Sequence, residues 1–327
     1  MIEKTIIITG SLGFIGSNLV RRLTRERSYK IICIDYCKNA NLNNIYVNKN
    51  VRFHPIDITD RHALDIIFLI EKPDVVLHLA AESFVDQAIE SAEPFIHSNV
   101  MGTQVLADLC CHHHVELVLI STDEVNGTLN SEAEPSWDES SPRKPRNPYS
   151  ASKAAAEMVV EAAGFTHGLR YKITRSCNNY GPRQSMRNFI PLSIKHILND
   201  TVMPIYGQGA EIREWIYVED NCDAIIKIME EGKAGEIYNI GTGHEMSNLE
   251  MFQLIYKVSG KKSDQLPIKF VANRKGHDFR YSLKNDKLKQ LGWAPHFKLK
   301  EGLASCYGWY SINRWALEQP NKEQNDR

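Results

Sequence analysis

A glycine-rich turn between a predicted strand and a predicted helix constrains the fold more than any other feature. The apolar run Thr5 to Thr9 is followed by GSLGFIG, Gly10 to Gly16, and then by helically spaced apolar residues up to Arg25. Glycines permit a tight turn, and a helix that begins there offers free N–H groups to a pyrophosphate. The pattern is typical of a dinucleotide-binding unit, although a βα turn without a ligand has the same local sequence.

The second predicted strand supports the dinucleotide interpretation. It runs from Lys30 to Ile34 and is followed by Asp35, about 20 residues after the last glycine. A carboxylate at this place accepts hydrogen bonds from a ribose diol and repels a 2′-phosphate. We therefore expect NAD rather than NADP as the cofactor.

Further apolar runs alternate with helical patterns. Strands are predicted at Val51 to Pro55, Asp74 to Ala81 and Glu116 to Ile120, with a helix from near Pro94 to Cys111. This alternation implies a parallel sheet covered by helices. We predict an α/β, Rossmann-type doubly wound parallel sheet over residues 1–175, and a smaller mixed α/β substrate-binding lobe over residues 176–327 that sends segments back to the first domain.

Two strand ends are expected beside the cofactor. Asp57 and Ile58 follow the third strand, where they would border an adenine. The fourth strand ends in Leu79, Ala80 and Ala81, and small residues there leave room for a cofactor. Both segments belong at the carboxyl edge of the sheet, where doubly wound folds bind ligands.

The stretch STDEV, Ser121 to Val125, ends the next strand with two hydroxyls and two adjacent carboxylates. At the carboxyl edge of the sheet these side chains would stand at the mouth of the ligand crevice. Asp123 and Glu124 could then act as an acid and a base on one substrate. The alternative is a polar strand end in which one of the two carboxylates caps the next element.

The segment NPYSASK predicts a helix that carries a second reactive pair. Asn147 suits the N-cap and Pro148 the first helical position. Tyr149 and Lys153 are four residues apart and share one face of the helix. A nearby ammonium and a nicotinamide cation would favour the phenolate of Tyr149. The alternative is that Lys153 only pairs with Glu157.

Composition restricts the partners. The 327 residues carry a formal net charge of -1 without a basic stripe, so neither nucleic acid nor a membrane surface is expected as a partner. No apolar run approaches the ~20 residues of a membrane span. Seven irregularly spaced cysteines and the lack of a signal peptide favour the cytoplasm. No metal site is expected, because adjacent side chains in the cluster Cys110 to His114 diverge on a helix.

The sequence resembles the extended short-chain dehydrogenases, and within them the nucleotide-diphosphate-glucose 4,6-dehydratases. The resemblance covers nearly the whole chain. It rests on GSLGFIG, LAAESFVD (79–86), STDEV, YSASK (149–153), NNYGP (178–182), REWIYVED (213–220), EIYNIG (236–241) and GHD (276–278).

The resemblance implies an NAD-dependent hydro-lyase that acts on dTDP-glucose or UDP-glucose. The implied reaction oxidises C4, eliminates water across C5 and C6, and returns hydride to C6. Its 4-keto-6-deoxy product would serve rhamnose-type deoxysugar biosynthesis. Thr122 and Tyr149 would hold the 4-hydroxyl, Lys153 would bind the nicotinamide ribose, and Asp123 and Glu124 would be the acid and the base.

The resemblance also implies two sets of binding residues and an oligomeric state. The cofactor set is Gly10, Gly13, Phe14, Ile15, Gly16, Asp35, Asp57, Ile58, Leu79, Ala80, Ala81, Ser98, Ser121, Tyr149 and Lys153. The substrate set is Ser83, Thr122, Asn178, Asn188, Phe189, Pro204, Tyr206, Arg213, Asn248 and His277. Arg213 also has a physical case as a cationic fork for a diphosphate. A homodimer is implied through helices near 94–111 and 148–164.

Four positions depart from the family pattern. The family commonly has tyrosine at Asn126, histidine at Phe84, lysine at Asn188 and proline at Lys275. The loss of lysine at Asn188 affects one phosphate contact. Two other functions remain open at this stage, a nucleotide-sugar 4-epimerase and a non-catalytic dinucleotide-sensing protein. The paired acids favour the dehydratase over the epimerase, and the intact YxxxK argues against a mere sensor.

Overall fold

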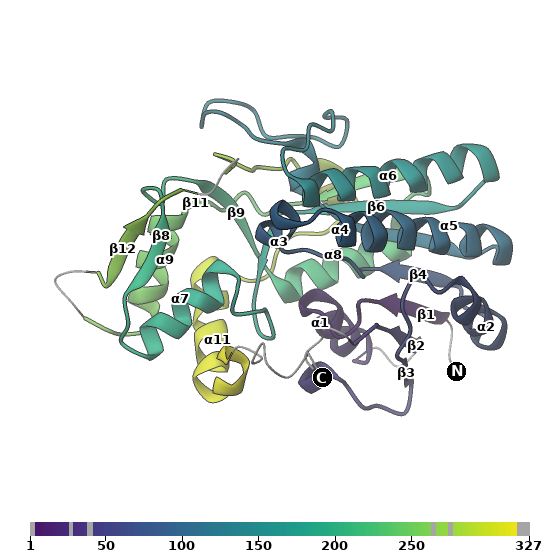
Figure 1. The fold of residues 1–327 in the computed structure, drawn as a ribbon, viewed down its shortest axis with the longest axis horizontal. Helices are drawn as coiled ribbons and strands as arrows, with labels where there is room; N and C mark the ends of the chain where they lie inside the picture. Colours follow the sequence, from purple (N-terminus) through teal and green to yellow (C-terminus); the bar gives the residue numbers. More distant parts are fainter. Residues whose placement is uncertain (1–3, 26–28, 38–41, 263–265, 274–276, 319–327) are drawn as a thin grey trace.

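A parallel sheet of seven strands forms the larger part of the molecule, in the order β10-β6-β5-β4-β1-β2-β3 (Figure 1). The computed structural model describes residues 4–25, 29–37, 42–262, 266–273 and 277–318. The strands of this sheet are β1 (Lys4–Thr9), β2 (Tyr29–Ile34), β3 (Val51–His54), β4 (Val75–His78), β5 (Glu116–Thr122), β6 (Tyr171–Ser176) and β10 (Glu236–Ile240). The predicted Rossmann-type α/β class is confirmed.

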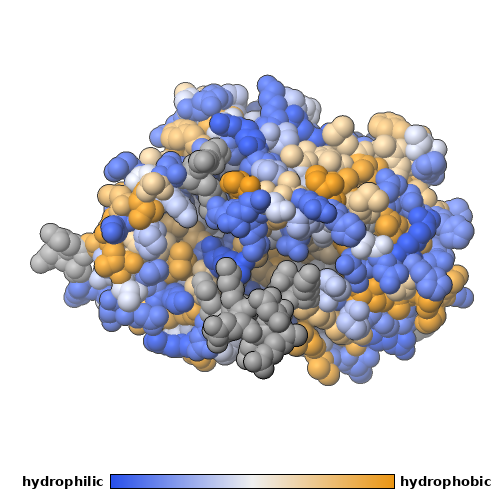
Figure 2. Space-filling model, in the orientation of Figure 1, coloured by the Kyte–Doolittle hydropathy of each residue, from blue (hydrophilic) through white to orange (hydrophobic). Residues whose placement is uncertain are grey.

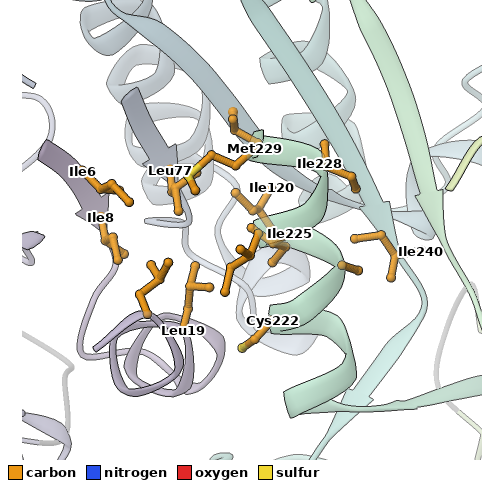
Figure 3. Close-up of a cluster of buried hydrophobic side chains, with 14 of the residues drawn as sticks. Ile6, Ile8, Leu19, Leu77, Ile120, Cys222, Ile225, Ile228, Met229 and Ile240 are labelled. Carbon is orange, nitrogen blue, oxygen red and sulfur yellow. The ribbon is translucent and has the colours of Figure 1, made fainter. Parts of the chain in front are cut away.

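Helices cover both faces of this sheet because its strands are apolar on both sides. Ile6 and Ile8 of β1 point to one face and pack with Leu19 and Ile225, as the close-up shows (Figure 3), whereas Ile7 packs in the cluster on the other face. The first face carries α1 (Phe14–Leu23) and α8 (Val218–Glu231). The second carries α2 (Arg61–Glu71), α5 (Gly102–His113) and α6 (Pro148–His167).

The smaller lobe has two short sheets and its own core (Figure 1). One sheet has the order β11-β9-β7 and the other pairs β12 with β8. The strands are β7 (Asn178–Tyr180), β8 (Met203–Tyr206), β9 (Ile212–Tyr217), β11 (Glu245–Ser247) and β12 (Ile268–Val271). The helices in this part of the chain are α7 (Phe189–Leu198), α9 (Asn248–Val258), α10 (Asp286–Gln290) and α11 (Leu299–Ile312). Between these segments, α8 and β10 belong to the large sheet and its covering helices, so the chain passes between the lobes.

The predicted helix from 94 to 111 is not one regular helix. The chain forms α3 (Val85–Glu90), a short turn α4 (Glu93–Phe95), a π-helical segment at Ile96–Met101 and then α5. The buried amide of Asn99 bonds to both backbone groups of Glu82 and to Ser152 Oγ at 2.8–2.9 Å. These three bonds hold Asn99 to the loop after β4 and to α6, at the point where the helix is wider than an α-helix. Periodicity cannot reveal such a contact, and π-helical turns often mark functional sites.

The strand order places the expected site. β1 lies between β2 and β4, so the order reverses there, and ligands of doubly wound sheets bind outside the carboxyl ends at this point. The segments after β1, β2, β4 and β5 therefore meet at one edge of the sheet. Polar side chains cover much of the face seen in Figure 2, with apolar ones between them. Among the described residues, no helix is long and apolar enough to cross a membrane.

Candidate active site

Two glycine positions of the turn, Gly10 and Gly16, have no room for a side chain. A Cβ at Gly10, where φ is +68°, would lie 2.7 Å from the backbone nitrogen of Ala80, and a Cβ at Gly16 would lie 2.1 Å from the carbonyl oxygen of Gly10. The turn therefore packs directly against the end of β4 and against α1. At its N-terminus α1 has Gly13 as the N-cap, without a side-chain cap and without an acidic residue in the first turn. This helix end, which includes Phe14 and Ile15, suits the pyrophosphate of a dinucleotide.

Asp35 lies next to this turn. Its carboxylate accepts hydrogen bonds from the backbone N–H groups of Leu12, at 2.9 Å, and Cys37, at 3.2 Å. Burial raises the pKa of the carboxyl group, and these backbone donors oppose that shift. A carboxylate held against the glycine turn, with further lone pairs to offer, is the acceptor that a ribose diol requires. The residues of this edge therefore fit NAD.

The other proposed cofactor residues surround the same edge. Asp57 accepts from the backbone and hydroxyl of Thr59, and Ile58 packs against Gly102, where a Cβ would lie 2.4 Å from the Ile58 side chain. Ser98 lies in the π-helical segment. β4 ends at His78 rather than at 81, so the remaining three residues form the loop after β4 that contacts the glycine turn: Leu79, Ala80 and Ala81.

β5 extends two residues beyond the predicted strand and presents the acidic pair in a 3₁₀ turn, Asp123–Asn126. The cap of this turn is Thr122, whose Oγ1 accepts from the N–H of Glu124 at 3.3 Å, so neither carboxylate is needed as a cap. Asp123 is only 2% exposed, and its Oδ1 accepts from the hydroxyl of Thr122 at 3.1 Å. Its buried Oδ2 has no hydrogen-bond partner in the described part of the chain.

The two carboxyl groups have different surroundings. Burial, then the charge of Glu124 and then that of Glu214, raise the pKa of Asp123 well above its usual range. This shift favours the protonated form of Asp123, which is the form that an acid catalyst needs. Glu124 accepts a hydrogen bond from the side-chain amide of Asn147 at 3.3 Å. Glu214 was not singled out from the sequence, although it belongs to the motif REWIYVED.

The predicted helix start is confirmed and brings Tyr149 to the acidic pair. Asn147 caps α6 in a capping box with Ser150, and Pro148 opens the helix. The side chain of Thr122 interacts with the phenol of Tyr149, and the Tyr149 ring meets Phe95 edge-on with centroids 6.4 Å apart. Thr122, Asp123, Glu124 and Tyr149 thus form one cluster.

The protonation of Tyr149 differs from the expectation. Burial, followed by the charges of the neighbouring carboxylates Glu124 and Asp123, raises the pKa of this phenol instead of lowering it. The ammonium of Lys153 donates to the backbone carbonyl of Ile120 at 2.7 Å, and burial lowers its pKa to about 8. We expected the ammonium and a nicotinamide cation to favour the phenolate, whereas in the chain alone burial, followed by the two carboxylates, raises the pKa of the phenol.

A buried ion pair lies one helical turn beyond Lys153. Glu157 accepts from the guanidinium of Arg175 at 2.7–3.3 Å and from Arg143 Nε at 2.6 Å. Both members of the central pair are at most 1% exposed. From the sequence, Glu157 was only an alternative partner of Lys153, whereas in the structure it forms salt bridges with the two arginines. The pair links α6 to β6.

Several proposed substrate residues converge in the smaller lobe. The ring of Phe189 lies 6.3 Å from Trp215, which pairs in register with Asn178. The ring of Tyr206 lies 6.4 Å from His277. Pro204 lies on β8 and Asn248 opens α9, while Ser83 lies on the loop after β4. Lys275 lies outside the described residues.

Arg213 is neither an open fork nor a surface side chain. It is 7% exposed and donates to the carbonyls of Ile212, Phe279 and Asp278 at 2.8–3.2 Å. Its guanidinium also lies 4.3 Å from the ring centroid of Tyr281. Three of its five N–H donors are therefore engaged by backbone, which positions the segment after His277.

The residues at three of the positions that depart from the family pattern, Phe84, Asn188 and Asn126, contact other parts of the chain. The guanidinium of Arg187 lies 5.0 Å from the ring centroid of Phe84, so the loop before α7 contacts the loop after β4. Asn188 is the N-cap of α7 and bonds to the carbonyl of Ser185 at 3.3 Å. Asn126 donates to two backbone carbonyls of the following loop. No group of three potential metal-binding side chains occurs among the residues described above.

Comparison with known proteins identifies the family. The model of the NAD dependent epimerase/dehydratase family matches residues 6–241. The chain belongs to this family. Its NAD-binding edge and reactive cluster both lie within the matched residues.

The relatives refine this assignment. A dTDP-glucose 4,6-dehydratase of Streptomyces niveus is 40% identical, with 98% of this chain and 96% of the relative covered. The low-salt glycan biosynthesis protein Agl12 of Haloferax volcanii is 43% identical, with 93% and 98% covered. The crystal structure of DesIV, a dTDP-glucose 4,6-dehydratase from Streptomyces venezuelae with NAD bound, superposes with a TM-score of 0.91 at 38% identity and covers 96% of this chain and 99% of DesIV. The expectations of an NAD-dependent enzyme and of a relationship to the 4,6-dehydratases are confirmed.

Proposed function

We propose that this protein converts a nucleotide-diphosphate-glucose, dTDP-glucose or UDP-glucose, to its 4-keto-6-deoxy product. One observation carries the proposal. A buried carboxyl group with a strongly raised pKa, Asp123, adjoins a second carboxylate, Glu124, in hydrogen-bonding distance of the Thr122–Tyr149 pair. Elimination of water needs an acid and a base on one substrate. A carboxyl group with a raised pKa suits the acid, and the adjacent carboxylate suits the base.

Each residue has a proposed role in the reaction. Tyr149 takes the proton of the 4-hydroxyl, which Thr122 helps to orient, and Lys153 holds the nicotinamide ribose. NAD, held by Lys153 and the glycine turn, would supply a positively charged ring that favours the Tyr149 phenolate and that can take hydride from C4 and return it to C6. The ketone formed at C4 acidifies the proton on C5, which Glu124 removes. Asp123 donates its proton to the departing 6-hydroxyl, and water leaves. When hydride returns to C6, Glu124 gives its proton back to C5.

The alternative function is a 4-epimerase of the same family. An epimerase also needs Tyr149 and Lys153 but has no use for a protonated acid beside a second carboxylate. The raised pKa of Asp123 therefore favours the dehydratase. A dinucleotide sensor needs neither the buried acid nor a tyrosine beside it.

The direct test is incubation of the purified protein with dTDP-glucose and with UDP-glucose, followed by mass spectrometry. The expected result is a loss of one water from one substrate. Recovery of an unchanged mass with both substrates, or of a 4-epimer, would overturn the proposal. The product would be an intermediate for rhamnose-type deoxysugars.

The role of Glu124 is tested by Glu124→Gln in single turnover. We expect transient absorbance of reduced nicotinamide, because the first hydride step uses Tyr149, without loss of water or exchange of solvent deuterium into C5. The matched control is Glu132→Gln, which changes an exposed carboxylate in the following loop and should leave the reaction unchanged. Normal deuterium exchange in Glu124→Gln would remove this residue from the mechanism.

We also propose a homodimer through the helices that cover the second face of the sheet. Large apolar side chains are exposed there: Ile89 (44%), Ile96 (47%), Met101 (52%), Met158 (59%) and Phe165 (87%). Their burial in a helix bundle would remove this apolar area from water. Light scattering of the Met158→Glu variant should then show monomers, whereas a wild-type monomer would refute the proposal.

The compartment proposed for the protein is the cytoplasm. All seven cysteines are free, and Cys33, Cys110, Cys177, Cys222 and Cys306 are buried. Free cysteines in a chain of this size suit a reducing environment.

A further inference from the structure

A cavity of about 420 Å³ lies outside the candidate active site, beside α1. Its walls come from α1, the loop after β7, the start of α8, and α11. We call it the arginine pocket. Its lining residues are Asn18, Arg21, Arg22, Arg25, Pro182, Arg183, Tyr217, Glu219, Ser305 and Trp309.

Two of the four arginines are balanced by carboxylates. Arg22 pairs with Asp223 at 2.6 Å, and Arg25 pairs with Glu219 at 3.4 Å. Asp223, which does not line the cavity, neutralises the charge of Arg22, and Glu219, which does, neutralises that of Arg25. The charge of Glu219 also acts on Arg183, but its salt bridge is with Arg25.

Arg21 and Arg183 bond instead to neutral acceptors. Arg21 Nη1 donates to the carbonyls of Ser17 and Asn44, both at 3.0 Å, and Arg183 Nη1 donates to Asn18 Oδ1 at 3.1 Å. Within the described ranges of the chain, neither guanidinium forms a salt bridge with a carboxylate. Burial, and then the charge of Arg183, lower the pKa of Arg21 to about 10. The two cations thus repel one another in a partly desolvated space, which an anion would relieve.

The backbone holds Arg183 in place at a conformational cost. Its φ is +71°, in the left-handed region that residues other than glycine rarely adopt. Asn18 fixes this loop twice, because its Nδ2 donates to the carbonyl of Pro182 at 3.0 Å while its Oδ1 accepts from Arg183. The guanidinium also lies 5.5 Å from the ring centroid of Trp309. Such backbone strain is characteristic of functional positions.

We infer that the arginine pocket is a second anion site, which binds a phosphate dianion, either free or as a phosphomonoester, between Arg21 and Arg183. Arginine forks match phosphate oxygens in charge and geometry, and the cavity is large enough for a small ligand that carries such a group. Tyr217 and Ser305, whose hydroxyls bond to each other at 3.1 Å, offer further donors at the wall.

The test is isothermal titration of the NAD-bound protein with inorganic phosphate, in chloride buffer and with thymidine diphosphate present at saturation. NAD and thymidine diphosphate are added to fill the phosphate-binding positions of the candidate active site. We expect one equivalent of phosphate to bind. The variant Arg183→Gly removes the cation but suits the positive φ, so it should fold and bind phosphate ~10–100-fold more weakly.

Two further variants complete the comparison. Arg21→Gln should weaken phosphate binding in the same way as Arg183→Gly. The control Arg170→Gln removes an arginine that is 74% exposed and outside the pocket, and should leave the affinity unchanged. The inference is overturned by a wild-type protein that does not bind phosphate, or by equal affinity in wild type and Arg183→Gly.

Discussion

The buried pair between Glu157 and Arg175 permits a quantitative prediction. Glu157→Gln keeps the shape of the side chain but removes the charge that compensates Arg175. The guanidinium of Arg175 is 1% exposed and cannot lose its proton in a folded protein. The variant therefore leaves an uncompensated cation in the interior between α6 and β6.

The expected cost follows from this burial. Removal of one partner from a buried ion pair typically lowers the free energy of unfolding by about 3–5 kcal/mol. The upper part of that range is favoured here, because Arg175 Nη1 already lacks a hydrogen-bond partner within the described structure. Arg143 is affected less, since its Nη2 also pairs with Glu161 at 2.7 Å. Replacement of both members by apolar residues, Glu157→Leu with Arg175→Met, should recover most of the loss.

Urea unfolding followed by tryptophan fluorescence measures this cost. The matched control is Glu231→Gln, which breaks an exposed pair with Lys227 on α8 at helical spacing. Such a pair contributes about 0.3–0.5 kcal/mol. A loss in Glu157→Gln as small as that of the control, or a double variant less stable than the single one, would refute the argument from buried charge.

The remaining predictions concern the reactive cluster and the cofactor. Tyr149→Phe should lower turnover ~10²–10⁴-fold in steady-state kinetics with little change in substrate affinity, and near-normal turnover would exclude Tyr149 as the base. Asp123→Asn removes a carboxyl group whose pKa is raised in the folded protein. Because the unfolded wild type loses this proton near pH 4 while the folded protein still holds it, the stability of the wild type falls as pH rises above 4. In urea titrations the stability of the variant relative to the wild type should therefore increase above pH 4, by at most about 1.4 kcal/mol per pH unit. A pH-independent difference would contradict this. Asp35 should make NAD bind more tightly than NADP in calorimetry, and Asp35→Asn should narrow the gap; equal affinities in the wild type would refute its role.

The local sequence determined the helices and strands, and with them the strand ends at which the candidate site lies. The glycines between Gly10 and Gly16 predicted a turn too tight for side chains, and the structure shows that a Cβ would collide with backbone at both ends. Asn147 and Pro148 predicted the start of α6. These features are encoded within one or two helical turns, because caps, turns and apolar periodicity depend on neighbouring residues.

Only the tertiary structure decided which side chains meet and in which protonation state. Glu214 reaches the neighbourhood of Asp123 from a strand of the smaller lobe, and its charge helps to keep that acid protonated. The direction of the Tyr149 pKa, opposite to our expectation, depends on burial and on two carboxylates from β5's end. The sequence suggested that the guanidinium of Arg213 is free to bind a diphosphate, whereas in the structure it donates to the backbone carbonyl of Asp278. Desolvation and long-range charge depend on how the two lobes pack, which no local pattern in the sequence records.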